Sequence, residues 1–163
     1  MKKYTQQEFD AFEVDERGYK ICPTGDYTEI KNFGRCCSFG RCCSFGEWCS
    51  FGECCSFGEC CSFGRCCSFG ERCSFGERCS FGERCNCEFG EFYKMLTIGG
   101  FGSGARTTYF FLLTGKALYV RCGCFRGTYD EWINKVQKTH HNSKYARAYL
   151  AAGEAVKIMC EEG

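Results

Sequence analysis

Between residues 33 and 86 the chain repeats one pattern of apolar and polar positions with a period of six. Each unit reads Phe, Gly, two variable residues, Cys and Ser or a final Asn, and nine units follow without a gap. On an extended strand Cys and Phe lie on one side of the intervening Ser, so we expect Phe and Cys inside and Ser outside. We expect the glycine to adopt a left-handed backbone conformation and the two variable residues to form a solvated corner. Units that bury their apolar face only against their neighbours indicate a solenoid.

The hexad resembles the repeat of the left-handed parallel β-helix superfamily, with Phe where an aliphatic residue is usual. The resemblance implies a mainly β fold, a triangular prism with 18 residues per coil, so nine hexads would form three coils. The charges agree with this period, because it stacks Arg35 on Glu53 and Glu47 on Arg65.

The segments on either side of the repeat predict caps. In residues 1–32, Thr5 to Glu8 form a capping box for a short helix, and residues 19–30 read as a hairpin. Residues 89–163 predict strands at 92–98, 107–113 and 117–125, followed by two helices that begin near Thr128 and at Asn142 or Ser143. We therefore expect an N-terminal cap (1–32), a β-helix (33–88) and a C-terminal α+β domain (89–163).

Fifteen of the 19 cysteines lie within or just after the repeat, so their number follows from the repetition. At the inward position a free thiol acts as a small hydrophobic group. Five further cysteines occupy corners: Cys36, Cys42, Cys54, Cys60 and Cys66. The pairs 36/54 and 42/60 would lie one coil apart, within reach of a disulfide, although a reducing compartment argues against the bond.

The charge distribution favours an anionic partner for the C-terminal domain. The whole chain carries a net charge of +1, whereas residues 89–163 hold ten basic and six acidic residues. The N-terminus lacks the apolar stretch of a signal peptide, and no apolar run reaches the length of a membrane span. We therefore expect a cytoplasmic protein, in the host cytoplasm if it is phage-encoded, with neither a membrane nor a nucleic acid as partner.

The glycine-rich stretch at residues 99–108, GGFGSGARTT, is a candidate ligand loop, because its free backbone and its arginine could hold a phosphate. It leads into a strand, so the dinucleotide-binding fingerprint is absent, and a plain flexible inter-strand loop is the alternative. The candidate ligand-binding residues are Gly102, Ser103, Arg106 and Thr107, with Arg121 and Arg126 as neighbours.

A weaker candidate is a zinc site. Cys85, Cys87, Cys122 and Cys124 could supply four thiolates if the C-terminal domain folded back over the last coil. Cys122 and Cys124 fit equally well as inward residues of their strand. No cofactor is expected.

The family resemblance implies two known activities, which the residues do not support. Hexapeptide β-helices are best known as trimeric acyltransferases, with γ-type carbonic anhydrases as relatives, and both use histidines on the coils or their loops. The repeat contains no histidine, and the chain holds only His140 and His141. We therefore assign no catalytic residue and expect a protein that is not an enzyme.

The C-terminal stretch VRCGCFRGTYDEW resembles one in uncharacterised small phage and bacterial proteins that also carry short β-helical repeats. This likeness implies a phage or mobile-element context. The leading hypothesis is a structural or interaction protein that self-associates through the β-helix, as a trimer, and binds a host or phage protein. The alternative is a protein that binds or sequesters a nucleotide or another small anion through loop 99–106 and the arginines of the C-terminal domain.

Overall fold

The computed structural model describes residues 1–102 and 104–161, which form two compact units. The first unit extends from Met1 to Glu91 and contains the N-terminal segment together with the repeat. The second unit begins at Phe92. Each unit is described by itself below.

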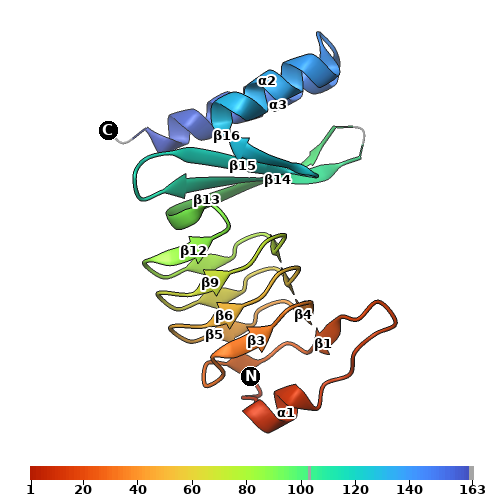
Figure 1. Ribbon diagram of the computed structural model, residues 1–163, viewed down its shortest axis with the longest axis vertical. Coiled ribbons are helices and arrows are strands. Elements are labelled where there is room, and N and C mark those ends of the chain that lie inside the picture. Colours follow the sequence, from red (N-terminus) through yellow and green to blue (C-terminus); the bar gives the residue numbers. More distant parts are fainter. Residues whose placement is uncertain (103, 162–163) are drawn as a thin grey trace. The chain divides into compact units, whose positions relative to one another are not determined.

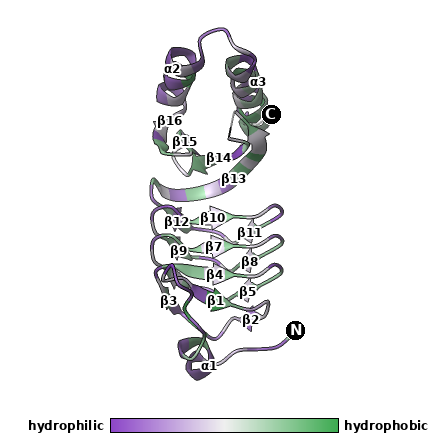
Figure 2. Ribbon diagram, turned by 90° about the vertical axis from the view of Figure 1, so that its right-hand side faces the viewer, coloured by the Kyte–Doolittle hydropathy of each residue, from purple (hydrophilic) through white to green (hydrophobic). Residues whose placement is uncertain are grey.

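The first unit is a β-solenoid of about four turns, built from three columns of short parallel strands (Figures 1 and 2). The first column contains β1 (Lys20–Cys22), β4 (Cys37–Phe39), β7 (Ser56–Phe57) and β10 (Ser74–Phe75). The second contains β2 (Asp26–Tyr27), β5 (Ser44–Phe45), β8 (Ser62–Phe63) and β11 (Ser80–Phe81). The third contains β3 (Asn32–Gly34), β6 (Ser50–Phe51), β9 (Ser68–Phe69) and β12 (Cys85–Cys87). Strand partners such as Ser56 and Ser74 are 18 residues apart, which confirms the predicted coil length.

The N-terminal segment supplies a coil that the sequence pattern did not reveal. Residues 19–30 were expected to form a hairpin, but β1 pairs in parallel with β4, and β2 pairs in parallel with β5. Tyr27 takes the place of a repeat phenylalanine and stacks on Phe45 with ring centroids 5.6 Å apart. The solenoid therefore has about four turns instead of three. The helix α1 (Gln6–Asp10) begins at the predicted capping box of Thr5 and Glu8.

Phenylalanine rings fill the interior of the solenoid. Within a column the rings stack face to face, as Phe39 does on Phe57 at 5.2 Å and 1°. Rings of different columns meet edge to face, as Phe51 and Phe57 do at 4.9 Å and 88°. Both arrangements are favourable for aromatic quadrupoles, so each ring is held by rings above, below and beside it.

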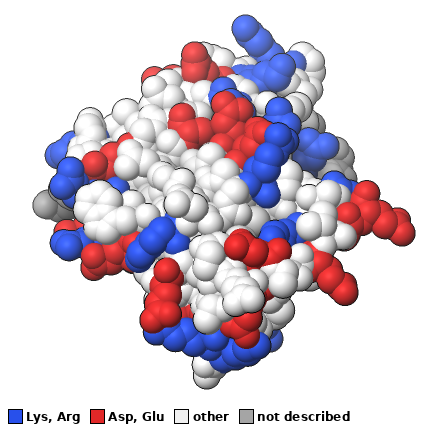
Figure 3. Space-filling model, turned by 60° about the horizontal axis from the view of Figure 1, so that its bottom comes forward, with Lys and Arg blue, Asp and Glu red and all other residues white. Residues whose placement is uncertain are grey.

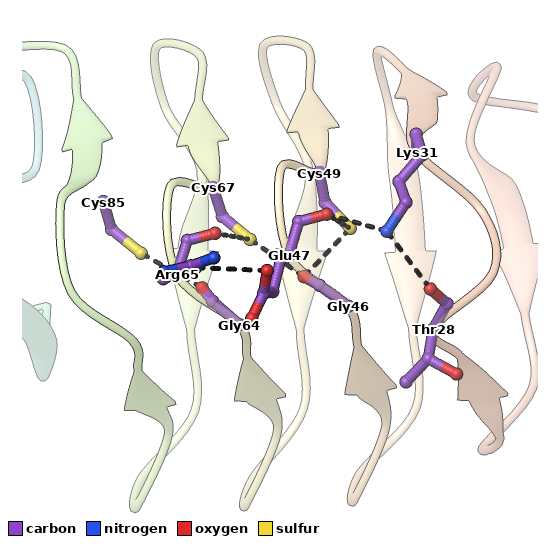
Figure 4. A network of polar contacts seen from close by, with 9 residues as sticks. All are labelled: Thr28, Lys31, Gly46, Glu47, Cys49, Gly64, Arg65, Cys67 and Cys85. Atoms are coloured by element: carbon purple, nitrogen blue, oxygen red, sulfur yellow. Dashed lines mark hydrogen bonds and ion pairs between the residues drawn. The ribbon is translucent and has the colours of Figure 1, made fainter.

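The inward cysteines are buried except for the half-buried Cys79, and each also makes a weak hydrogen bond that a plain hydrophobic residue could not make. Cys67 Sγ donates to the Gly46 carbonyl of the preceding coil at 3.3 Å, and Cys85 Sγ donates to the Gly64 carbonyl at 3.5 Å (Figure 4). Cys61 and Cys73 repeat this contact in the other columns. Cysteine therefore supplies both a small apolar volume and a donor for a half-buried glycine carbonyl of the preceding coil.

At the corners, the left-handed backbone conformation falls on a different residue of the hexad from the one predicted. The residue with φ near +60° is the second variable position, for example Cys54 at φ 59° and Arg78 at φ 58°. Among the repeat glycines only Gly34 has a positive φ. The others are required by close packing, because a Cβ on Gly58 would lie 2.6 Å from the Arg41 backbone nitrogen of the coil before it.

Figure 3 shows Lys and Arg side chains interspersed with Asp and Glu side chains on the face that it displays. Two of the stacked corner pairs form ion pairs, Arg35 with Glu53 at 2.9 Å and Arg65 with Glu47 at 3.1 Å. These contacts agree with the 18-residue register.

The second unit is an antiparallel sheet with two helices on one face. The sheet contains β13 (Gly90–Phe101), β14 (Arg106–Leu113), β15 (Leu118–Cys122) and β16 (Phe125–Thr128). The strand expected at 117–125 is a hairpin instead, because the chain reverses at Gly123, where φ is 60°. The helices are α2 (Tyr129–His140), capped by Thr128, and α3 (Lys144–Cys160), capped by Ser143.

The core of this unit lies between the sheet and the helices and consists of Phe110, Val120, Trp132, Val136, Ala146, Tyr149 and Val156. No helix in the described part of the chain is both long enough and apolar enough to cross a membrane.

Candidate anion-binding pocket

The candidate ligand loop connects β13 to β14 and lies against α3. Gly102 has φ 72°, and a Cβ at this position would meet the Tyr149 hydroxyl. The left-handed backbone conformation therefore favours glycine here. Ser103, the next candidate, lies outside the described residues.

Strand alternation places the other loop candidates on two different faces of the sheet. Arg106 shares a face with Thr108 and Phe110, and Phe110 packs edge to face on Trp132 of α2 at 5.4 Å. Thr107 lies on the opposite face with Tyr109. Arg106 is therefore the candidate that reaches the helix side of the sheet.

Arg121 does not join Arg106. Its guanidinium lies 4.4 Å from the centroid of the Tyr109 ring and 5.7 Å from that of Phe111, and only 7% of the residue is exposed. This is a cation–π arrangement on the face of the sheet away from the helices. Arg126 is directly opposite Arg121 in the pairing of β15 with β16, and it borders the pocket described next.

Arg106 borders a pocket of about 540 Å³ between the sheet and the helices. The lining consists of Arg106, Cys122, Cys124, Phe125, Arg126, Trp132, Lys135, Val136, Thr139, His140 and Tyr149. Three of these residues are basic, and none of them is an aspartate or a glutamate. The pocket thus combines cationic groups with an aromatic and aliphatic wall, which suits an anion that also carries an apolar part.

Tyr149 connects the parts of this pocket. Its ring lies nearly parallel to His140 at 5.7 Å and edge to face with Trp132 at 5.9 Å. Cys122 Sγ lies 3.9 Å from its hydroxyl. Burial raises the pKa of Tyr149 to about 12, with Cys122 adding to the shift and Arg106 opposing it. The phenol is therefore neutral near pH 7, where it can donate a hydrogen bond to an anion.

Sequence reasoning did not identify the residues that α2 and α3 contribute. Trp132, Val136 and His140 lie in the helix expected to begin near Thr128, and Tyr149 lies in the helix expected after it. Lys135 and Thr139 follow Trp132 at spacings of three and seven residues, so all of these α2 positions share one helix face. That periodicity is the signal in the sequence, although it does not show that the face meets Arg106.

A second hollow in the same unit, of about 580 Å³, has a mixed lining. Lys116 and Lys157 border it together with Asp130 and Glu161. Because acidic and basic groups alternate around it, its charge does not select a ligand of one sign. It is therefore a weaker candidate than the pocket beside Arg106.

The four zinc candidates have other contacts. Cys85 Sγ donates to Gly64 within the solenoid, and Cys87 Sγ lies 3.5 Å from the Gly90 carbonyl. Thr108 Oγ1 donates to Cys122 Sγ at 3.2 Å, and Cys124 is exposed in the turn between β15 and β16. Within residues 1–102 and 104–161, no group of three or more His, Cys, Asp or Glu side chains is placed to hold a metal ion.

Comparisons of this chain with protein-family models, with curated proteins and with solved structures find no match.

Proposed function

We propose that this protein is a non-catalytic binding protein whose C-terminal unit holds a small anion with an aromatic or apolar part. The observation that carries the proposal is the lining of the 540 Å³ pocket, which contains Arg106 and Lys135 but no carboxylate. A phosphate or carboxylate group would pair with the guanidinium, which binds such groups in a planar, bidentate way. The apolar part of the ligand would contact Trp132 and Phe125.

A calorimetric titration with three probes tests this proposal. Adenosine monophosphate carries an anion and an aromatic base, whereas inorganic phosphate and adenosine each carry only one of the two. We expect the nucleotide to bind at least tenfold more tightly than either part, and Arg106→Gln to weaken it by at least tenfold. Arg147→Gln is the matched control, because Arg147 is an exposed residue of α3 outside the lining. Equal binding by the Arg106 variant, or no preference for the nucleotide, would contradict the proposal.

For the solenoid we propose a structural role, as a left-handed β-helix of the hexapeptide type that associates into a trimer. Its outward serines support a packable face, since Ser56 Oγ donates to Ser38 Oγ at 3.2 Å along one column. Trp48 is 64% exposed at a corner and offers apolar surface to a neighbour. Native mass spectrometry with Trp48→Ser as the variant tests this; a monomer at micromolar concentration would exclude the trimer. The protein partner, the phage context and the cytoplasmic location remain part of this proposal.

A further inference from the structure

The corner cysteines form two vertical pairs on the surface of the solenoid. Cys36 and Cys54 occupy the same corner on successive coils, and so do Cys42 and Cys60. All four are half-buried free thiols. The fifth corner cysteine, Cys66, has Trp48 and Arg84 as the equivalent residues of the adjoining coils and has no cysteine partner.

The backbones of each pair are equivalent. Cys36 and Cys54 have φ values of 54° and 59°, and Cys42 and Cys60 have 55° and 58°. Hydrogen bonds link the coils at these corners, from Cys36 N to the Glu53 carbonyl at 2.9 Å and from Cys42 N to the Glu59 carbonyl at 2.7 Å. Stacked parallel strands lie about 4.8 Å apart, so the two Cβ atoms of a pair are separated by about this distance.

This separation does not favour a disulfide, because bridged cysteines need Cβ atoms about 3.5–4.5 Å apart. It suits a single soft cation held between two thiolates. With a metal–thiolate bond of about 2.3 Å, a linear sulfur–metal–sulfur unit spans about 4.6 Å, close to the coil spacing. Among the described residues, no three His, Cys, Asp or Glu side chains are grouped so that they could hold a metal ion. Each corner pair therefore allows coordination by two sulfurs.

Each pair also has an arginine beside it. Arg35 precedes Cys36, and its guanidinium is held between the Glu53 carboxylate at 2.9 Å and the corner thiols. Arg41 precedes Cys42, and the Cys42 side chain, with Glu59 and Cys60, raises the pKa of this guanidinium. The guanidinium beside each pair would balance the single negative charge that two thiolates and one monovalent cation carry together.

We propose that the pairs Cys36–Cys54 and Cys42–Cys60 each bind one soft monovalent metal ion, Cu(I), in linear two-sulfur coordination. Soft thiolate ligands select Cu(I) over harder cations. Two thiol protons pass to solvent for each ion bound, and no electron is transferred. This site lies in the solenoid and is independent of the anion pocket of the C-terminal unit.

The test is an anaerobic titration of the full chain with Cu(I) against a chromophoric Cu(I) chelator. We expect two ions per chain to resist the chelator. Cys36→Ser and Cys42→Ser should each retain one ion, and the double variant none, whereas Cys66→Ser should retain two. Far-ultraviolet circular dichroism checks that each variant keeps the fold, and X-ray absorption should find two sulfur neighbours per copper.

Three results would overturn the proposal. The double variant could retain the ions, which would place them on other thiols. Cys66→Ser could lose as much copper as Cys36→Ser, which would show that pairing does not matter. The copper could also have three sulfur neighbours, which the corner geometry does not allow.

Discussion

The substitution Gly58→Ala tests why the repeat requires glycine. A Cβ at Gly58 would lie 2.6 Å from Arg41 N, 2.7 Å from the Gly40 carbonyl carbon and 2.8 Å from Arg41 Cα. Ordinary contacts between such atoms are about 3.5–4.0 Å, so the two coils must separate by about 1 Å to accept the methyl group. All three atoms belong to the backbone, so no side-chain rotation can relieve the contact.

The cost follows from the bonds that this separation would stretch. Gly58 N donates to the Phe39 carbonyl at 3.1 Å, and Cys42 N donates to the Glu59 carbonyl at 2.7 Å. Losing two such bonds costs about 2 kcal/mol, and overpacking adds about 1–3 kcal/mol. The stiffer unfolded chain offsets about 0.4–1 kcal/mol of this, which leaves about 2–5 kcal/mol of destabilisation. Urea unfolding followed by far-ultraviolet circular dichroism measures this difference.

Arg78→Gly provides the matched control on the neighbouring corner. Arg78 has φ 58°, a conformation that costs a non-glycine residue about 1–2 kcal/mol, whereas glycine adds about 0.5–1 kcal/mol of backbone entropy to the unfolded state. The variant should therefore be as stable as the parent or about 1 kcal/mol more stable. The requirement for glycine at position 58 would be refuted if Gly58→Ala kept the parent's urea midpoint while Arg78→Gly was destabilised.

Three further predictions concern the same fold. Phe57→Asp should abolish the folded solenoid, because it buries an unpaired carboxylate among stacked rings, and a soluble variant with the parent's circular dichroism would show that Phe57 is not inward. Arg65→Gln should cost at most about 1 kcal/mol in urea unfolding, since its ion pair with Glu47 is exposed to solvent, and a loss of several kcal/mol would contradict this. Burial raises the pKa of Tyr27 well above its usual range and that of Tyr149 to about 12. The unfolded chain loses these phenolic protons near pH 10 while the folded chain retains them, so stability should be full below pH 10 and fall as the pH rises towards 12. Urea midpoints at pH 9 and pH 11 should show this fall, and Tyr149→Phe should reduce it; an unchanged slope would count against the burial of this phenol.

The repeat could be predicted well because its period determines the register. Any coil other than 18 residues would separate Arg35 from Glu53 and would not stack identical rings such as Phe39 and Phe57. The first coil was missed because it lacks the hexad: Cys22 and Tyr27 take the places of phenylalanines, and Pro23 lies in the connection between them. Pairing with the next coil, not a local pattern, makes these residues strands.

The pocket could be predicted only in part. Arg106 follows a glycine-rich loop, which a sequence can reveal. Whether a strand residue faces the helices depends on register, and this separates Arg106 from Thr107 and Arg121. Tyr149 reaches the pocket from a helix more than 40 residues further along the chain, so its role is set by tertiary packing alone.

The contacts in the solenoid also explain which positions of the hexad can change from one repeat to the next. Phe57 is held by six neighbouring rings, Cys67 by a carbonyl of the preceding coil, and Gly58 by the backbone of the coil before it. The two corner positions are not held by these contacts. Within the nine hexads the residue type changes at those two positions, and once more at the end, where Asn86 replaces the last Ser. The corner left-handed position holds Cys in five of the first six hexads, Trp48 in the other and Arg in the last three. Because left-handed backbone does not favour either residue, their side chains are the reason to expect function at the corners. The proposed Cu(I) pairs lie at the cysteine-bearing end of this gradient, where a change in one corner residue alters ligand chemistry without disturbing the stacked core.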